Sequence, residues 1–402
     1  RLPPHFGYLI AAGLDQALDY LSHLQFTPEQ IQALQATGIF EHAPAELWDL
    51  LAEGRFSGDV WAVPEGTPVF AHEPLLRIEA PLWQAQVAET YLLNALNYQT
   101  LIATRAARLR DIAGPEATLL EFGTRRAFSP QASLWAARAA LAGGLDGTSN
   151  VLAALRLGQR PVGTMAHALV MAIGALQGGE DEAFAAFSRY FPAAPLLIDT
   201  YDTLAAATRL AQQVKRGDRT LTGVRLDSGD LVELSQRVRS LLPEVKIFAS
   251  GDLDEWEIER LHTAGACLDG YGLGTRLVTG STVNGVYKLV EIAGQPTMKH
   301  SSQKETYPGR KQVWRQATGD RLALADESPL PEAQPLLALV MQHGQRCYPP
   351  EDLATIRQRA TQAVARLPAG VRRLTDPEPW RADLSPALQQ LRADLLQAGV
   401  PA

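Results

Sequence analysis

Residues 223–230 read Gly223-Val224-Arg225-Leu226-Asp227-Ser228-Gly229-Asp230, a short apolar run that ends in two carboxylates around a small turn. A strand that stops at such residues and is followed by a helix-like segment is one unit of a strand–loop–helix repeat. Near-continuous apolar strands belong in a parallel sheet that is covered on both faces. The segment therefore predicts an α/β fold with polar side chains at the carboxyl ends of its strands.

The same pattern recurs along the middle of the chain at intervals of roughly 20–28 residues, the length of one strand, loop and helix. The further runs are Leu196-Leu197-Ile198 before Asp199, Lys246–Ala249 before Ser250, and Leu268–Tyr271 before Gly272. Polar residues at successive strand ends are what the active site of a barrel requires. An open doubly wound sheet uses the same units and remains an alternative.

The flanking regions have other patterns. Helices are predicted at 7–24 and onward to 51, short strands between 59 and 78, a long helix at about 82–110, and strands again at 285–292 and 311–315. We therefore predict an irregular (β/α) barrel at 116–282, with a smaller α/β domain built from 1–115 and a β-rich segment at 283–345. Residues 346–402 are predicted to be a helical, solvent-facing tail.

The composition excludes several classes of protein. The 402 residues are 46% hydrophobic and 20% charged, and the net charge of -7 argues against a nucleic-acid partner, which usually needs a broad basic surface. Two cysteines make neither a disulfide framework nor a cysteine-rich zinc site, and their scarcity fits a cytoplasmic location. The sequence has no apolar run of about 18–20 residues, so no membrane partner is expected. No signal peptide is visible, and we expect that some sequence precedes Arg1.

The turn after 223–226 carries the sharpest chemical signal. Asp227 and Asp230 can hold Mg²⁺ through oxygen ligands, bind ribose hydroxyls or stabilise a cationic centre. Arg225 lies on the same side of the strand as Asp227 and can orient that carboxylate or meet an anionic ligand. The alternative is an ordinary turn in which an aspartate caps the next helix.

Two glycine-rich segments are candidate phosphate sites. Free backbone N–H groups around Gly274, together with the Thr275 hydroxyl, can cradle a phosphate. The run 143–150, which includes Ser149, ends in cap residues before a helix and can receive an anion in the same way. Plain turns are the alternative for both segments.

A histidine and an aromatic–arginine pair complete the candidates. His167 is expected just past a strand at 161–162, where it can act as a general base, as a nucleophile toward phosphorus, or as a structural histidine. A flat heteroaromatic acid can stack on Phe122 while Arg125 meets its carboxylate. The alternative is a packed phenylalanine with surface arginines.

In this order the motifs resemble the nicotinate phosphoribosyltransferase family, from the first residues to about Arg315. The matching segments are Gly7–Leu14, Asn97–Thr104, Phe122–Ala127, Asp146–Ala153, Gly163–His167, Gly223–Asp230, Gly274–Thr279, Gly285–Val290 and Pro308–Val313. The resemblance implies a homodimer that joins nicotinate to phosphoribosyl pyrophosphate in NAD salvage, giving nicotinate mononucleotide and pyrophosphate. It also implies coupling to ATP hydrolysis and a requirement for Mg²⁺.

The resemblance assigns roles residue by residue. The phosphorylated histidine of the family falls on His167, and carboxylates beside the ribose and the metal fall on Asp202 and Asp227, of which Asp227 is the metal candidate. The predicted substrate-binding residues are Thr164, Arg225, Thr275, Phe122, Arg125, Ser149, Gly251 and Gly274.

This sequence departs from the family pattern in two respects. Family members open with a helix whose tyrosine reaches the pyridine pocket of the partner chain, and this sequence begins after that segment. Many members also have serine after the histidine, where this chain has Ala168. The alternatives are a nicotinamide or quinolinate phosphoribosyltransferase, or a non-catalytic relative that binds phosphosugars.

Overall fold

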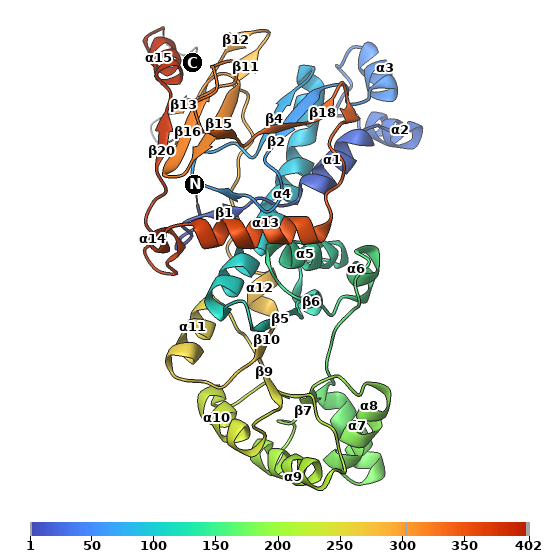
Figure 1. Cartoon of the computed structure of the whole chain (residues 1–402). Coiled ribbons are helices and arrows are strands. Elements are labelled where there is room, and N and C mark those ends of the chain that lie inside the picture. Colours follow the sequence, from blue (N-terminus) through green and yellow to red (C-terminus); the bar gives the residue numbers. More distant parts are fainter. Residues whose placement is uncertain (1, 302–303, 399–402) are drawn as a thin grey trace. The chain divides into compact units, whose positions relative to one another are not determined.

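The computed structural model describes residues 2–301 and 304–398 (Figure 1). The chain divides into two compact units, and each is assembled from separate stretches of chain. Unit 1 comprises Arg1–Leu101, Thr282–Asp352 and Pro368–Ala402, and unit 2 comprises Ile102–Ser281 and Leu353–Leu367. The division falls inside helix α4 (Leu82–Ala113), so this helix contributes to both units.

The division differs from the predicted one at the C-terminal tail. Helix α13 (Leu353–Arg366) goes with unit 2, because its buried face of Ile356, Ala360 and Val364 packs against helix α5 (Pro130–Gly143). The rest of the tail goes with unit 1, where strand β20 (Ala382–Leu384) pairs with strand β16 (Gly319–Leu324). These residues are therefore integral parts of the two units.

Unit 2 is built on a six-stranded sheet with the order β6-β5-β10-β9-β8-β7. Each neighbouring pair is parallel, which confirms the α/β fold predicted from the apolar runs. The strands are β5 (Thr118–Glu121), β6 (Gly147–Thr148), β7 (Leu196–Leu197), β8 (Gly223–Leu226), β9 (Lys246–Ser250) and β10 (Gly270–Leu273). Within the described residues, β6 and β7 end the ladder and are not hydrogen-bonded to each other, so the ladder is open.

Helices connect these strands in the expected alternation. Several begin at a side chain that accepts from the first free backbone N–H groups, such as Asn150, Asp202, Asp230 and Asp254. The helical elements of unit 2 besides α4, α5 and α13 are η1 (Thr124–Arg126), α6 (Val151–Arg156), α7 (His167–Gln177), α8 (Glu180–Tyr190), α9 (Thr203–Arg216), α10 (Leu231–Leu241), α11 (Glu255–Thr263) and α12 (Thr275–Val278).

The described part of unit 1 contains two four-stranded sheets, with the orders β19-β18-β2-β4 and β17-β15-β16-β20. Besides β16 and β20, the strands of this unit, in these two sheets and outside them, are β1 (Leu9–Ile10), β2 (Asp59–Ala62), β3 (Pro68–Val69), β4 (Leu76–Glu79), β11 (Glu291–Ile292), β12 (Gln295–Pro296), β13 (His300–Ser301), β14 (Lys304–Glu305), β15 (Lys311–Gln316), β17 (Gln334–Pro335), β18 (Ala338–Gln342) and β19 (Gln345–Arg346). Its helices are α1 (Leu14–Ser22), α2 (Pro28–Ala36), α3 (Glu46–Glu53), α14 (Ala369–Arg372) and α15 (Pro386–Gln397). None of the described helices is long and apolar enough to cross a membrane.

Two expectations for unit 1 were wrong in detail. Residues 9–10 form a strand instead of the start of a helix, because the whole run from 6 to 14 is buried and β1 pairs with β3. Of the strand predicted at 285–292, only β11 forms. Val286 and Leu289 are exposed, and the Gly285 N–H donates to the side chain of Asn97 instead of to a strand. The predicted strand at 311–315 is confirmed as β15.

Candidate active site

Two carboxylates meet where strands β7 and β8 end. Asp199 follows β7 and Asp227 follows β8, and the parallel pairing of these strands places both at one edge of the sheet. The Asp199 Oδ2 atom accepts from the Asp227 N–H at 2.8 Å and from the Ser228 hydroxyl at 2.7 Å. The side chain of Asp199 is 2% exposed, and its Oδ1 atom has no hydrogen-bond partner within the described residues. One buried oxygen is thus left for a ligand, a cation or an imidazole.

His167 lies beside these carboxylates. Its Nδ1 atom is 3.1 Å from the Thr200 hydroxyl, and its Nε2 atom is 3.7 Å from Asp227 Oδ2 and 3.9 Å from Asp199 Oδ1. The strand predicted before it at 161–162 does not form, although the Val162 N–H donates to the carbonyl of Thr148. His167 is the first residue of α7 and is partly exposed, so its ring can be reached by a substrate.

A guanidinium group from β8 joins the cluster. Arg225 Nη2 donates to the carbonyl of Met165 at 3.3 Å, and Nη1 lies 3.8 Å from Asp227 Oδ1. Burial lowers the pKa of Arg225, Asp227 and Asp199 raise it, and the charge of Arg125 lowers it. A guanidinium stays protonated in proteins despite such a shift. Arg125 thus adds positive charge to the surroundings of Arg225, and the two can attract an anion.

Phe122 lies against the neighbouring strand β10. A Cβ atom added to Gly272 would come within 2.6 Å of the Phe122 ring and 3.2 Å of the Ser250 Cβ atom. The Ser250 hydroxyl in turn donates to Asp227. Phe122 is therefore connected to the carboxylate cluster through Gly272 and Ser250. A substrate ring that stacks on Phe122 would lie beside this cluster.

The turn after β9 passes directly over Asp227. Gly251 has a φ of 99°, and a Cβ atom there would lie 2.5 Å from the carbonyl oxygen of Asp227. Asp252 follows with a φ of 48°, which is uncommon for a residue with a side chain. Glycine is therefore required at position 251 both for its backbone conformation and for this close approach.

Asp202 has other neighbours than those expected of a catalytic carboxylate. Its Oδ1 atom accepts from the N–H groups of Leu204 and Ala205 at 3.0 and 2.9 Å, which makes it the N-cap of α9. Burial raises the pKa of Glu180 on α8, and the charge of Asp202 adds to this rise. Asp230 caps α10 in the same way. For this residue the alternative stated above, an aspartate that caps the next helix, is the one observed. The catalytic role of Asp202 stays a prediction without geometric support.

The remaining predicted residues lie at strand or helix ends around the cluster. The Thr164 hydroxyl donates to the carbonyl of Met165, which also accepts from Arg225. The Ser149 N–H donates to the carbonyl of Glu121 at 2.9 Å. Gly274 and Thr275 follow β10 and begin α12. Their contacts with substrate stay predictions.

Sequence reasoning missed Asp199, Thr200 and Ser250 as parts of the site. A positional signal was present, because Asp199 directly follows Leu196-Leu197-Ile198 as Asp227 follows the run 223–226. The residue that comes first after an apolar strand run is therefore a better candidate than an aspartate farther along, which is free to cap the next helix.

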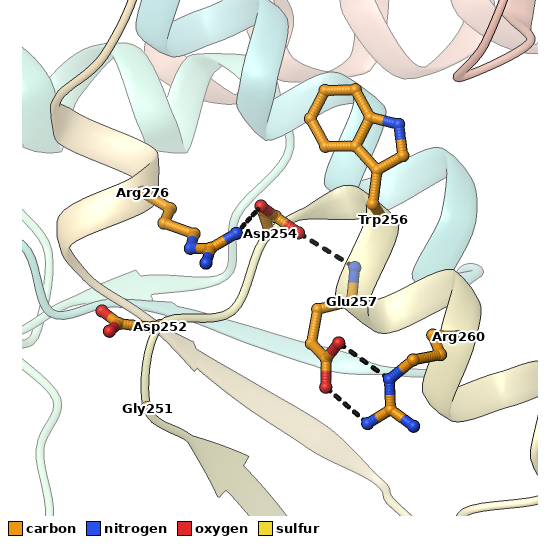
Figure 2. Close-up of a pocket in the computed structure, with 7 residues that line it drawn as sticks. All are labelled: Gly251, Asp252, Asp254, Trp256, Glu257, Arg260 and Arg276. Atoms are coloured by element: carbon orange, nitrogen blue, oxygen red, sulfur yellow. Dashed lines mark hydrogen bonds and ion pairs between the residues drawn. The ribbon is translucent and has the colours of Figure 1, made fainter.

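An open pocket of about 620 Å³ borders the turn after β9 (Figure 2). It shares Gly251 with the site, but the pocket's arginines are occupied: Arg276 pairs with Asp254, and Arg260 pairs with Glu257. The lining residues are Gly251, Asp252, Asp254, Trp256, Glu257, Arg260 and Arg276. His167 is not among them, so the candidate active site is the cluster of His167, Arg225, Asp199 and Asp227.

The cluster offers few side-chain ligands for a metal ion. Within the described residues, no group of three or more His, Cys, Asp or Glu side chains is placed to hold one. Mg²⁺, however, is usually bound by one or two carboxylates together with substrate phosphates and water. The unpartnered Asp199 Oδ1 and the nearby Asp227 Oδ2 fit that mode.

A histidine, two carboxylates and a guanidinium group thus meet at the carboxyl ends of parallel strands, where α/β enzymes have their active sites. Models of the nicotinate phosphoribosyltransferase N-terminal domain, the family itself and its C-terminal domain match residues 1–97, 117–251 and 327–392. The chain belongs to the nicotinate phosphoribosyltransferase family.

Curated and solved relatives agree with this assignment. The chain is 40% identical to nicotinate phosphoribosyltransferase pncB2 of Mycobacterium tuberculosis, over 94% of this chain and 82% of that protein. It is 38% identical to nicotinate phosphoribosyltransferase of Bacillus subtilis, over 96% and 86%. The crystal structure of human nicotinic acid phosphoribosyltransferase superimposes with a TM-score of 0.83 at 31% identity, covering 98% of this chain and 94% of that one.

Proposed function

We propose that this protein transfers the phosphoribosyl group of phosphoribosyl pyrophosphate to nicotinate in NAD salvage. The bond between the ribose C1 atom and the pyrophosphate oxygen breaks, and its electrons leave with pyrophosphate. The ring nitrogen of nicotinate donates its lone pair to C1, giving nicotinate mononucleotide. Family membership and the relatives named above support this reaction.

The observation that carries the proposal is the meeting of Arg225, Asp227, Asp199 and His167 at the ends of β7 and β8. Departure of pyrophosphate leaves a cation-like ribose carbon, which a preorganised carboxylate stabilises. Asp227 is already oriented for this task by the Ser250 hydroxyl. We assign Asp227 to the ribose and Asp199 to its support.

The pyridine acid is assigned to the region of Phe122, Arg125 and Arg225. A flat ring stacks on Phe122, and the two guanidinium groups pair with the carboxylate of nicotinate. Charge-assisted pairing favours an acid over the neutral amide of nicotinamide. Thr164, Ser149, Gly251, Gly274 and Thr275 are assigned to the phosphoribosyl and pyridine ends of the substrates, on the family resemblance.

His167 is assigned as the site of phosphorylation by ATP. When its Nδ1–H donates to the Thr200 hydroxyl, the Nε2 atom keeps a free lone pair. A bond from Nε2 to the γ-phosphorus then forms as the bond to the bridging oxygen breaks, and ADP leaves. Hydrolysis of this phosphohistidine couples ATP to the transfer.

Mg²⁺ is assigned to Asp227 with Asp199, and when bound it neutralises the charge of the leaving pyrophosphate. Asp199 is suited to bind the ion through Oδ1, because its side chain is buried and its Oδ2 atom is fixed by two hydrogen bonds. We also expect a homodimer in the cytoplasm, on the resemblance to the family.

The decisive test mixes the purified protein with nicotinate, phosphoribosyl pyrophosphate and Mg²⁺, with and without ATP, and follows nicotinate mononucleotide by chromatography. Nicotinamide and quinolinate are supplied in parallel reactions and as competitors. Formation of the nicotinate product at the highest kcat/KM supports the proposal. Faster turnover of either other pyridine assigns the chain to that reaction, and absence of product in all three leaves a phosphosugar-binding relative.

His167→Ala tests the coupling. The variant should keep basal transfer and its thermal unfolding temperature, because His167 is a partly exposed residue at a helix start. Its stimulation by ATP should fall to near one-fold. Stimulation equal to that of the unaltered protein would remove His167 from this role.

A further inference from the structure

A buried polar network lies beneath the turn that joins β5 to α5. Its members come from four different places: Glu121 ends β5, Thr148 ends β6, Asn150 caps α6 and Ser133 lies in the first turn of α5. All four residues are less than a tenth exposed. The network therefore joins segments of unit 2 that are separated in the sequence.

The hydrogen bonds run in one continuous chain. Glu121 accepts from the Gly123 N–H with one oxygen and from the Thr148 hydroxyl with the other. The Thr148 oxygen accepts from the Asn150 N–H at 3.0 Å. The Asn150 amide donates to Ser133 at 3.1 Å, and the Ser133 hydroxyl donates to the carbonyl of Pro130 at 2.7 Å. Each side chain is satisfied by its neighbour, which is the arrangement that makes a buried network rigid.

A carboxyl group is a costly choice at this position. Glu121 is 1% exposed, and neither of its oxygens contacts a cation among the described residues. Burial raises the pKa of Glu121, while the bonds from Thr148 and Gly123 lower it. A buried acid without a charged partner lowers stability relative to an apolar side chain. Its presence therefore calls for a role other than stability.

The strand geometry shows which residues this network serves. Successive side chains of a strand point to opposite faces, so Glu121 and Phe122 lie on opposite sides of the sheet. Phe122 faces Gly272 and Ser250, next to the carboxylate cluster, while Glu121 holds the backbone of Gly123 from behind. The main chain of Glu121 also contacts the segment that carries Ser149, because the Ser149 N–H donates to the Glu121 carbonyl.

We propose that Glu121 and Thr148 are positioning residues for the pyridine acid: they fix the turn that carries Phe122 and Arg125 against the segment that carries Ser149. The inference rests on the proposed function for the identity of the ligand. It predicts that the network governs the KM for nicotinate, with little effect on the KM for phosphoribosyl pyrophosphate.

Thr148→Val tests this with a side chain of equal shape. The variant leaves a Glu121 oxygen and the Asn150 N–H unpaired, so the KM for nicotinate should rise about tenfold, while the KM for phosphoribosyl pyrophosphate stays within about twofold. Thr148→Ser keeps the hydroxyl and should behave like the unaltered protein. Glu121→Gln should give an intermediate KM for nicotinate, because an amide accepts from only one of its two present donors.

The matched control is Ser235→Ala, which removes another buried hydroxyl of unit 2, bonded to Val232 and Cys267. It should lower the unfolding temperature as Thr148→Val does, without separating the two KM values. An equal rise of both KM values in Thr148→Val, or the same separation in Ser235→Ala, overturns the proposal.

Amide hydrogen exchange provides a readout that does not depend on turnover. In Thr148→Val, peptides covering 122–128 should exchange faster than in the unaltered protein, whereas those covering 227–230 should not change. Unchanged exchange over 122–128 overturns the proposal even if the enzyme is active. If the unaltered protein makes no mononucleotide, the proposed function fails, and the exchange experiment still decides whether the network fixes this turn.

Discussion

Asp199 and Asp202 follow the same short strand, yet the structure gives them different surroundings. Asp199 is buried beside His167, with one oxygen held by the backbone of Asp227 and the other unpartnered among the described residues. Asp202 is exposed and its oxygen is used to cap α9. A carboxylate that is fixed and has an oxygen to spare suits catalysis, whereas a cap is a structural device.

Exchanging each for asparagine separates these roles. Asp199→Asn keeps an oxygen that can accept from the Asp227 N–H but removes one of the two carboxylates assigned to Mg²⁺, so kcat/KM should fall by about 100-fold. Asp202→Asn should change kcat/KM by less than about twofold, because asparagine caps a helix as well as aspartate does. Steady-state kinetics of both variants would show the difference, and equal losses would return Asp202 to the catalytic set.

Gly251 is a second residue whose identity is fixed by its surroundings. Gly251→Ala places a Cβ atom against the Asp227 carbonyl at a positive φ, so the turn must shift and kcat/KM should fall by about 10- to 100-fold. Gly217→Ala is the matched control, because Gly217 has a φ of 77° with no other atom within 4 Å of the added carbon. It should lower only stability, by about 1–2 kcal/mol. Similar kinetics for the two variants would contradict the steric argument.

At the scale of the element, the 227–230 turn divides its two carboxylates between function and folding. Asp227 faces Arg225, Ser250 and His167, whereas Asp230 accepts from the N–H groups of Val232 and Glu233. Asp230→Ala should therefore lower the free energy of unfolding by about 0.5–2 kcal/mol with kcat/KM unchanged. Asp230→Asn should restore the stability. Denaturant unfolding and kinetics on the same samples check both, and a loss of kcat/KM in Asp230→Asn would place this residue in the site.

The elements also show what the sequence could and could not predict. The strand before Asp227 was predicted at its observed bounds, since its apolar run is local information. The strand β1 was not, because residues 9–10 form it only by pairing with Pro68 and Val69, far along the chain. Asp199 was missed for a related reason: its role depends on His167 and Asp227, which the fold brings to it from other segments. Local patterns predict elements, and long-range contacts decide which of their residues meet.

At the scale of the whole molecule, a buried acid in unit 1 makes stability depend on pH. Glu73 and Asp320 share a buried site with Arg315, and burial together with Asp320 raises the pKa of Glu73 to about 9. The ordinary value, 4.5, applies to the unfolded chain. Between pH 4.5 and about 9, Glu73 keeps a proton in the folded state that it has released in the unfolded state. The free energy of unfolding therefore falls as the pH rises through this range, and the stability that comes from this proton is lost as the pH passes the folded pKa.

Glu73→Gln removes this dependence, because the amide resembles the protonated acid. The free energy of unfolding of the variant, relative to the unaltered protein, should rise from about pH 5 to about pH 8, at up to about 1.4 kcal/mol per unit. Glu46→Gln, at an exposed glutamate of α3, is the control and should show no such trend. Denaturant titrations at several pH values measure the difference, and a constant offset across the range would contradict a raised pKa.

The discontinuous make-up of the two units has a consequence for synthesis of the chain. Unit 2 lacks α13 until residue 367 has been made, and unit 1 lacks β20 and α15 until the last 35 residues, 368–402, have followed. A ribosome releases the chain from its N-terminal end, so the amino-terminal helices and strands leave the exit tunnel long before their partners exist. Neither unit can therefore complete its packing until these later segments have emerged, and unit 2 receives its last helix before unit 1 receives its last strand.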